Sequence, residues 1–347
     1  MNENTIPHTV EHLLQLLQTI TRTEHLSFTV EQDRLMIPKF GTSFNIISLD
    51  AYSTGEIHHR LQQSRLNMGR SNTDSIPLLC VPFMKEAGKI ICQEEQMSWF
   101  DLSGNAHITT NTLHIFIEGK ANKYPDIGRP SNLFASKSSR IVRWLMMYPN
   151  EPWTQRLLSQ HTGVSEGFVS RIVKGLLNEH YIIKHNRKIQ VSHPTMVLQA
   201  WKEAYDFDHH TIIKGHIPAR NIEQLTKRLQ QTLSNLDIQY ALSGLAGAWM
   251  ISPFAQYQTT TCYISQVPNQ HLLQELGFRQ TDLGANMWFV IPDDEGIWEG
   301  VTPLTELAIP TVHPFQVWLD LKAHPERADE ASEVIFQHIL REYFDDT

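Results

Sequence analysis

The chain has 347 residues and a formal net charge of −8, a length that fits two or three domains and a charge that excludes a generally basic surface for nucleic acid. Its three cysteines, Cys80, Cys92 and Cys262, are far apart and form no Cys-x-x-Cys pair, which argues against a disulfide framework and a cysteine-rich zinc site. No signal peptide and no apolar run of about 18 residues is present. We therefore expect a cytoplasmic protein without a membrane partner.

The first block, residues 1–125, alternates helical and strand patterns. A helix is expected over residues 9–20, and strand patterns surround Leu26, Ile46, Ile76 and Leu113. This order predicts an α/β or α+β domain. Residues 126–137 lie in a stretch rich in Pro, Gly, Asn and Ser, which predicts a linker.

The second block, residues 138–192, contains three helical patterns followed by a hairpin pattern. Pro149 ends the first helix, and Thr154 is a candidate N-cap for the second. Gly163 follows, where a left-handed residue closes a helix at low cost. Ser165 is then a candidate N-cap for the third helix.

The third helix of this block has two different faces. Its apolar stripe consists of Val169, Ile172, Val173 and Leu176, at helical spacing. Its other face is polar and basic and carries Gly167, Ser170, Arg171, Lys174 and Asn178. A basic turn with Lys184, Arg187 and Lys188 follows between two short strands. A helix-turn-helix with a basic hairpin is typical of a winged helix, which inserts its third helix into the major groove of DNA.

The charge distribution supports this interpretation. Between Lys137 and Lys188 the sequence has nine basic and three acidic residues, so this segment carries +6 and the remainder carries −14. We expect the basic side chains from Arg140 to Lys188 to converge on one surface for a polyanion. The candidate DNA contacts are Thr154, Ser165, Gly167, Phe168, Ser170, Arg171, Lys174, Lys184, Arg187 and Lys188. The alternative is a three-helix unit that docks another protein.

The third block, residues 193–347, is expected to be a second α/β domain. Helical patterns cover residues 196–205, 222–236 and 271–276, strand patterns cover residues 259–265 and the segment "MWFVIP", and an acidic helical tail closes the chain. The segment "YDFDHHTIIKGH" gathers Asp and His residues that could bind a metal. Because His209 and His210 are adjacent and point apart, we favour a solvated loop.

Several motifs in order resemble a known family. These are "FDLSGNAHI", "LHIFIEG", "WTQRLLSQHTGVSEGFVSRIVKGL", "WKEAYDF", "YALSGLAGAWMISPFA" and "HPFQVWLDLKAHPERADEA". Together they resemble the bacterial AbiEi-like family of transcriptional regulators, which is related to the antitoxins of type IV toxin–antitoxin systems. The resemblance is clear over residues 95–335 and weak before them. It implies a DNA-binding regulator, often one that represses its own operon.

The two outer blocks are similar to the folds of known enzymes, but each block lacks part of the catalytic residues that those enzymes use. Residues 1–125 resemble restriction endonucleases, with Asp33 and Asp50 at the acidic positions, but Tyr52 stands where the charge-stabilising Lys belongs. Residues 193–347 resemble nucleotidyltransferases, with a turn at Ser243 and Gly244, but residues 259–265 contain no carboxylate to hold a metal. Small residues near this turn are expected to allow close packing instead.

The sequence thus predicts a multidomain α/β (α+β) protein with a central winged helix-turn-helix at 138–192, between domains at 1–125 and 193–347. We expect a transcriptional regulator, an antitoxin-like repressor whose partner is double-stranded DNA, with no catalytic residue, metal or cofactor. A homodimer would suit inverted repeats, although no dimer helix is identifiable. The alternatives are a metal-dependent nuclease and a pure interaction protein.

Overall fold

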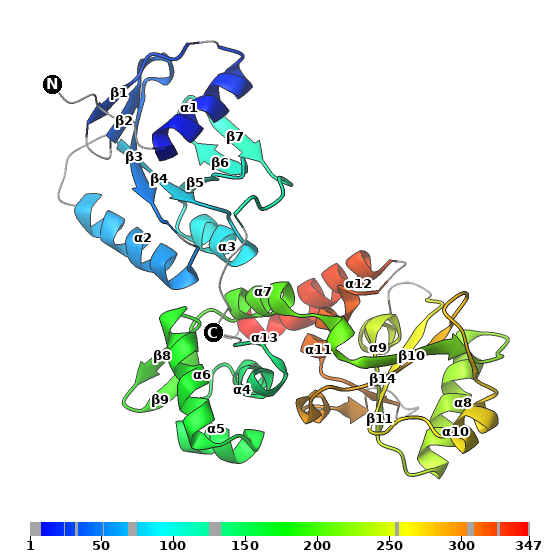
Figure 1. The fold of residues 1–347 in the computed structure, drawn as a ribbon. Helices are drawn as coiled ribbons and strands as arrows, with labels where there is room; N and C mark the ends of the chain where they lie inside the picture. The colour runs from blue at the N-terminus through cyan, green and yellow to red at the C-terminus, as the bar shows by residue number, and fades with distance from the viewer. Residues whose placement is uncertain are drawn as a thin grey trace. The chain divides into compact units, whose positions relative to one another are not determined.

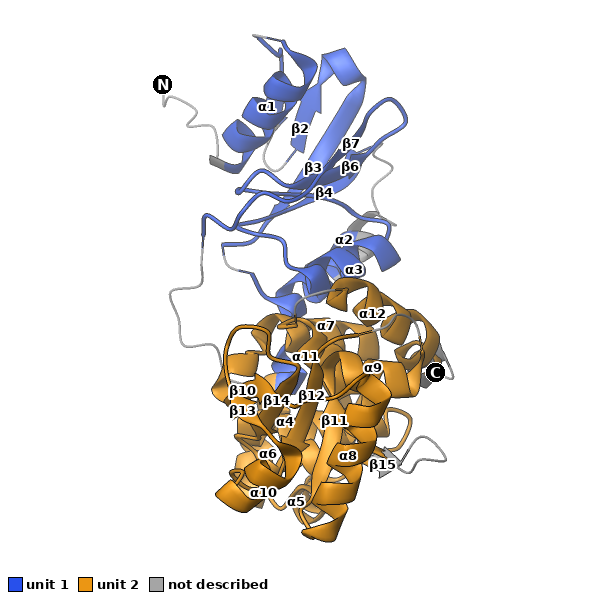
Figure 2. Cartoon of the chain, turned by 90° about the vertical axis from the view of Figure 1, so that its right-hand side faces the viewer, with its two compact units in different colours: residues 1–131, 176–181 blue, residues 132–175, 182–347 orange. Residues whose placement is uncertain are grey.

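The computed structural model describes the chain except at residues 1–7, 24, 32–33, 51, 69–74, 125–132, 254–256, 304–308, 325–326 and 346–347. Helices and mixed sheets confirm the expected α/β class (Figure 1). The chain divides into two compact units, residues 1–131 with Leu176–Tyr181 and residues 132–175 with 182–347 (Figure 2). Most of the predicted linker, residues 126–132, lies outside the described residues. Within the described ranges, no helix has the length and apolar character needed to cross a membrane.

Unit 1 contains a seven-stranded sheet whose strands follow the chain order. The strands are β1 (Thr29–Glu31), β2 (Arg34–Ile37), β3 (Thr42–Ser48), β4 (Ser75–Val81), β5 (Ser98–Asp101), β6 (Ala106–Thr109) and β7 (His114–Ile117). The central strands β3, β4 and β5 are parallel, and the outer pairs are antiparallel. Parallel neighbours need crossover connections, and helices α2 (Thr54–Met68) and α3 (Glu86–Glu94) provide them.

Helices cover both faces of this sheet. Helix α1 (His8–Thr21) buries Leu13 and Leu17 in a core cluster with Phe44 and Phe100 of the sheet. Successive strand residues face opposite sides, so Trp99, which is also buried, belongs to the other face. That face carries α2 and α3, because consecutive right-handed crossovers place their helices on one side. The helix predicted over residues 9–20 is therefore confirmed.

Unit 2 contains a second seven-stranded sheet with the order β13-β10-β14-β12-β11-β16-β15. Its strands are β10 (Thr211–His216), β11 (Tyr240–Ser243), β12 (Thr260–Ile264), β13 (Arg279–Gln280), β14 (Met287–Ile291), β15 (Thr302–Pro303) and β16 (Pro310–Thr311). The helices after residue 193 are α7 (Pro194–Ala204), α8 (Ile222–Asn235), α9 (Gly244–Ile251), α10 (Gln270–Leu276), α11 (Pro314–Leu321), α12 (Ala328–Ile335) and α13 (Glu342–Asp345). Each helical pattern predicted in this block is present.

The solvated loop expected over Asp206–His216 is wrong for most of its length. Phe207 is buried at the start of a short 3-10 helix, and residues 211–216 form strand β10. The strand pairs with β14 along residues 211–215 and with β13 at Gly215 and His216. The sequence concealed it because its apolar residues, Ile212 and Ile213, are adjacent and give no alternating pattern.

The expected close packing at the turn after β11 is confirmed. Gly244 has a φ of 55°, in the left-handed region. A Cβ atom at this position would lie 2.4 Å from Nε2 of His324. At Gly247, a Cβ atom would lie 3.1 Å from Cγ2 of Val317 on α11. The two glycines therefore let α9 approach its neighbours.

We expect Gly244→Ala to lower the free energy of unfolding by about 2–3 kcal/mol, since left-handed backbone strain adds to overpacking. Gly284→Ala is the matched control, because Gly284 has a φ of 68° but a Cβ atom added there would meet no atom within 4 Å. Urea denaturation of both variants separates strain from crowding. Equal losses in the two variants would contradict the packing role of Gly244.

Candidate nucleic-acid interface

Three helices and a hairpin lie between residues 136 and 191, as the sequence predicted, and the last residues of the third helix, 176–178, are grouped with unit 1. Helix α4 (Ser136–Met147) begins inside the predicted linker and buries Ile141, Leu145 and Met146. Helix α5 (Gln155–Thr162) is capped by Thr154, whose hydroxyl accepts a hydrogen bond from the Leu157 amide at 3.2 Å. The helix ends at Gly163, with φ 65°. The predicted N-cap and left-handed closure are both confirmed.

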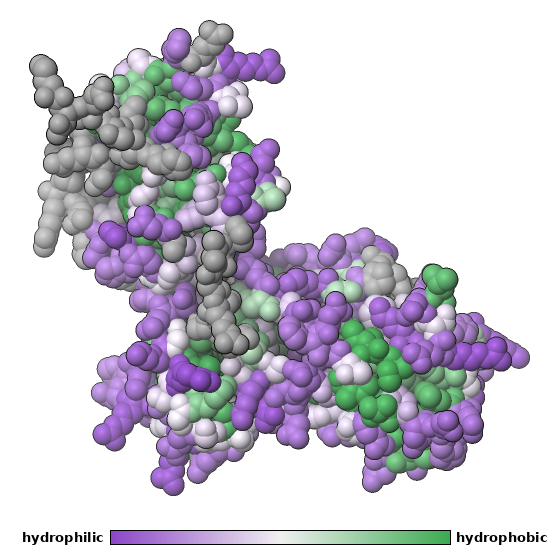
Figure 3. Space-filling model, in the orientation of Figure 1, coloured by the Kyte–Doolittle hydropathy of each residue, from purple (hydrophilic) through white to green (hydrophobic). Residues whose placement is uncertain are grey.

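Helix α6 (Glu166–Asn178) has the two faces that its sequence predicted. Val169, Ile172, Val173 and Leu176 are at most 5% exposed. The other face is exposed and carries Gly167, Ser170, Arg171 and Lys174. Ser165, directly before the helix, is also exposed. The helix therefore presents a polar and basic stripe to solvent, and in Figure 3 hydrophilic side chains line the outer edge of the surface over α5, α6 and the following hairpin, with less polar residues between them.

The hairpin consists of β8 (Ile182–His185) and β9 (Lys188–Val191). Its two-residue turn places Asn186 and Arg187 at φ 48° and 68°, so both are left-handed. Lys184, Arg187 and Lys188 are exposed around this tip. Turns of this kind match the twist of a hairpin, and here they hold three cations on a short ribbon.

A backbone bridge that the sequence pattern did not reveal attaches the hairpin to the helices. The amide of Trp153 donates to the carbonyl of Ile189 at 2.8 Å, and the amide of Ile189 donates back at 2.6 Å. Trp153 also packs against Trp144 and His161, with ring centroids 5.6 and 5.4 Å away. A single bridging residue has no periodicity, so only the apolar character of Trp153 could have indicated it.

Phe168, the remaining candidate on α6, organises positive charge near the start of the helix. The guanidinium of Arg171 lies 4.6 Å from the centroid of its ring, and Nζ of Lys137 lies 5.7 Å from it. Such cation–π contacts contribute roughly 0.5–1 kcal/mol at exposed sites. Phe168 is half-buried, so it holds Arg171 near the helix while leaving the guanidinium accessible.

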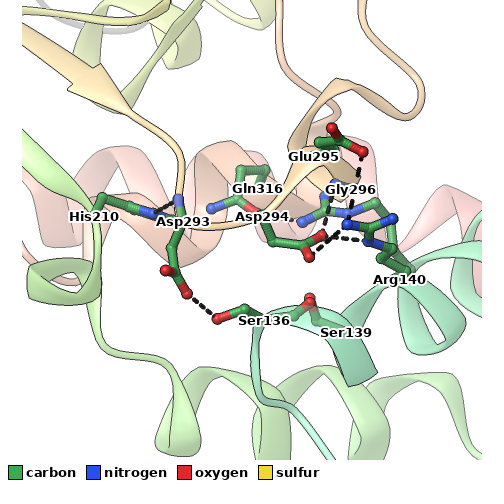
Figure 4. Close-up of polar contacts among 10 residues, drawn as sticks. Ser136, Ser139, Arg140, His210, Asp293, Asp294, Glu295, Gly296 and Gln316 are labelled. Atoms are coloured by element: carbon green, nitrogen blue, oxygen red, sulfur yellow. Dashed lines mark hydrogen bonds and ion pairs between the residues drawn. The ribbon is translucent and has the colours of Figure 1, made fainter. Parts of the chain in front are cut away.

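The expectation that all basic side chains from Arg140 to Lys188 converge on one surface needs a correction at two residues. Arg140 binds both carboxylate oxygens of Asp294, at 2.7 and 2.8 Å, which also fixes α4 to the loop after β14 (Figure 4). Arg143 is only 3% exposed. Both point into unit 2, where acidic and aromatic partners from distant sequence segments surround them.

The other basic residues remain exposed and without local neutralisation. They are Lys137, Arg156, Arg171, Lys174, Lys184, Arg187 and Lys188. No acidic side chain in the described part of the chain lies within 4.0 Å of their charged nitrogens. Unpaired cations on one helix face and on an adjacent hairpin are available to a polyanion.

The positions in unit 1 that resemble an endonuclease site do not form a complete catalytic site among the residues that the structure describes. Asp33 lies outside the described residues, and Asp50 is exposed after β3. Tyr52 is half-buried, and Nζ of Lys85 lies 4.9 Å from the centroid of its ring. Among the described residues, no three His, Cys, Asp or Glu side chains gather with metal-binding geometry.

The corresponding turn in unit 2 leads to a buried carboxylate, Asp320, for which the sequence predicted no role. Asp320 on α11 is fully buried and accepts hydrogen bonds from Ser243, Tyr205 at 2.5 Å, Tyr263 at 3.1 Å and Gln316 at 2.7 Å. Burial raises the pKa of Asp320 to about 6, although these hydrogen bonds oppose the shift. Because four donors bind this carboxylate, we interpret Asp320 as part of the polar core of unit 2.

The tip residue Arg187 gives a testable trade-off between stability and binding. A non-glycine residue in the left-handed region costs about 1 kcal/mol, so Arg187→Gly should raise the free energy of unfolding by about 0.5–1 kcal/mol. The same change should weaken DNA binding, because it removes an exposed cation. Urea denaturation and fluorescence anisotropy measure the two effects. Loss of stability, or unchanged DNA affinity, would count against this role for Arg187.

Comparison with known proteins adds no assignment to this geometry. No protein-family model, no curated protein and no solved structure matches the chain. The interface is therefore interpreted from its own residues.

Proposed function

We propose that this protein binds duplex DNA through α6 and the β8–β9 hairpin and regulates transcription. The observation that carries the proposal is the exposed, unneutralised basic face of α6 beside a hairpin with three exposed cations. Three helices followed by such a hairpin are typical of a winged helix. An α-helix fits the major groove, and a basic hairpin can reach the flanking phosphates.

Each candidate residue has a proposed role. Ser170, Arg171 and Lys174 enter the major groove, where Arg and Lys can donate to guanine O6 and N7. The backbone near Thr154, Ser165 and Gly167, at the starts of α5 and α6, meets phosphates, because helix N-termini attract anions. Phe168 positions Arg171, while Lys184, Arg187 and Lys188 contact the backbone beside the site.

The proposed regulator is a cytoplasmic repressor of the antitoxin-like kind that the sequence resemblance implies. Sequence-specific reading needs the α6 side chains to reach base edges, and a repressor acts by occupying a promoter. In this proposal the domain after residue 193 is a scaffold. Its buried carboxylate Asp320 already accepts four hydrogen bonds.

Selection from a pool of random duplexes tests the proposal. Bound sequences should converge on a consensus, and fluorescence anisotropy at physiological salt should give an affinity at least about 10³-fold above that for random DNA. Arg171→Ala should reduce this ratio and relax the preference at one base pair, at a cost of about 1–3 kcal/mol. Exposed Arg279 on β13 provides the control variant Arg279→Ala.

Two results would refute the proposal. One is a selected pool without a consensus, with equal affinity for all duplexes. The other is cleavage of plasmid DNA that requires Mg²⁺ and is abolished by Asp50→Ala, which would favour a nuclease instead.

A further inference from the structure

Strand β7 leaves one edge of the sheet in unit 1 open. Among the described residues β6 is its only strand neighbour, so its other side has no pairing partner (Figure 1). Proteins usually protect an edge strand by making it short or by placing Lys or Pro on it. The other edge strands of the two large sheets have two or three residues, whereas β7 has four and contains neither Lys nor Pro. Its central residue Phe116 is 61% exposed.

The hydrogen bonds of β6 show which backbone groups of β7 point outward. The hydroxyl of Ser98 on β5 accepts from the amide of Thr109 at 3.0 Å and donates to its carbonyl at 3.3 Å. Thr109 therefore turns its backbone groups toward β5, and it is not bonded to His114, which it faces on β7. Bonded and non-bonded pairs alternate in an antiparallel ladder, so the pair of His107 and Phe116 is non-bonded as well. His114 and Phe116 consequently direct their N–H and C=O groups away from the sheet.

A second copy of β7 matches these outward groups in an antiparallel register centred on Phe116. A two-fold axis then sets Phe116 against Phe116 of the second copy, and His114 against Glu118 of the second copy. Glu118 is the next outward position along the chain. Each facing pair can exchange both of its backbone hydrogen bonds, at a Cα separation of about 5.5 Å. Facing aromatic side chains on paired strands also stabilise the pairing.

The side chains that flank Phe116 are complementary in this register. His114 and Glu118 are both exposed, and they lie on the same face of the strand because successive residues alternate. The imidazole of one copy can donate a hydrogen bond to the carboxylate of the other. Glu118 contacts Lys89 through Oε1 at 3.0 Å, and its side chain is still 40% exposed. Both ends of the paired strands would therefore join a donor to a carboxylate.

The opposite face of β7 matches as well, through apolar contacts. Ile115 is buried in the core cluster beneath α1, and Ile117 is partly buried against the same cluster. In the proposed register Ile117 faces Ile115 of the second copy. Pairing would thus cover the part of Ile117 that remains accessible and extend the core from one copy to the other.

We propose that two copies of this chain dimerise by pairing their β7 strands antiparallel about Phe116, which joins the two sheets into one. The pairing does not depend on the DNA-binding function proposed above. It would provide the two-fold symmetry with which dimers of DNA-binding proteins read inverted repeats.

Sedimentation equilibrium of the full chain without DNA measures the association. We expect a monomer–dimer equilibrium with a micromolar dissociation constant, because a single strand pair makes a small interface. Phe116→Lys should weaken the dimer at least about tenfold, since two like charges would meet at the axis. The matched control is Val267→Lys, at an apolar position with 63% exposure outside both sheets. If Phe116→Lys does not fold, His114→Glu should weaken the dimer in the same way, because it would face Glu118.

A cysteine at position 116 tests the register. The three native cysteines are buried, and facing residues of a bonded antiparallel pair lie about 5.5 Å apart, within reach of a disulfide. Mild oxidation of Phe116→Cys should therefore give a covalent dimer on a non-reducing gel, while Val267→Cys should remain monomeric. A chain that stays monomeric at high micromolar concentration, a dimer that persists in a folded Phe116→Lys or His114→Glu variant, or Phe116→Cys without a cross-link would overturn the proposal.

Discussion

Replacing Arg171 and Lys174 together by Glu should lower the affinity for duplex DNA by more than about 100-fold, because each lost contact to a base or phosphate costs about 1–3 kcal/mol. Both side chains are exposed on α6 and have no acidic partner among the described residues. The replacement places two negative charges where the DNA backbone would approach. The loss should be largest at low salt, where charge interactions are least screened.

The same double variant should leave stability nearly unchanged, since exposed substitutions usually alter it by less than about 0.5 kcal/mol each. The matched control is Arg220→Glu with Arg279→Glu, which changes the net charge equally at exposed positions outside α6 and the hairpin. Fluorescence anisotropy of a labelled duplex measures both proteins. If the two double variants lose affinity equally, net charge rather than the α6 face governs binding.

Acidification from pH 7 towards pH 4 should destabilise the protein by about 2.5 kcal/mol per pH unit near pH 5. Burial lowers the pKa of His210 and His324 to about 4 and that of His313 to about 3. Each of these residues stays neutral in the folded chain but takes up a proton in the unfolded chain below its ordinary pKa of 6.5. Their contribution to the free energy of unfolding is therefore complete above pH 6.5 and is lost as the pH falls.

Asp320 acts in the opposite direction. Its folded pKa of about 6 exceeds its ordinary value of 3.8, so its favourable contribution is complete below pH 4 and is lost as the pH rises through 6. Three histidines against one aspartate leave a net uptake of about two protons on unfolding near pH 5. Urea denaturation at several pH values measures the slope. A free energy of unfolding that increases as the pH is lowered from 6.5 to 5 would contradict this balance.

His324 provides the single-residue test of the pH effect. Its Nδ1 donates to the carbonyl of Asp320 at 2.7 Å, so the neutral ring accepts at Nε2 from the Thr261 hydroxyl at 2.6 Å. Protonation of Nε2 would remove that acceptor. His324→Gln should therefore flatten the pH slope by about half, while replacement of exposed His271 by Gln should leave it unchanged.

Local patterns in the sequence were sufficient to predict the helices and the exposed face of the candidate interface. The stripe from Val169 to Leu176 fixed which side of α6 is buried, and the opposite side had to carry Arg171 and Lys174. Thr154 and Gly163 marked the ends of α5 because capping depends on neighbouring backbone groups. These features require no knowledge of distant residues.

Features that depend on distant partners could not be predicted. Arg140 and Arg143 look like further surface cations in the sequence, but Asp294 and Gln316, more than 150 residues away, bind them. Asp320 lies within one of the motifs that carry the resemblance, but nothing in that motif indicates its role, which arises from Gln316 on the same helix and from donors on three other segments. A count of local charge therefore overstated the basic surface by two residues.

Hydrogen–deuterium exchange of the full chain, with and without a selected duplex, tests the location of DNA binding most directly. We expect the strongest protection in residues 165–174 and 182–191, which contain the exposed basic face of α6 and the hairpin. Protection should be lost at these segments in the Arg171→Glu, Lys174→Glu variant. Protection confined to unit 1 or to the sheet after residue 193, with α6 and the hairpin unchanged, would contradict the proposed interface.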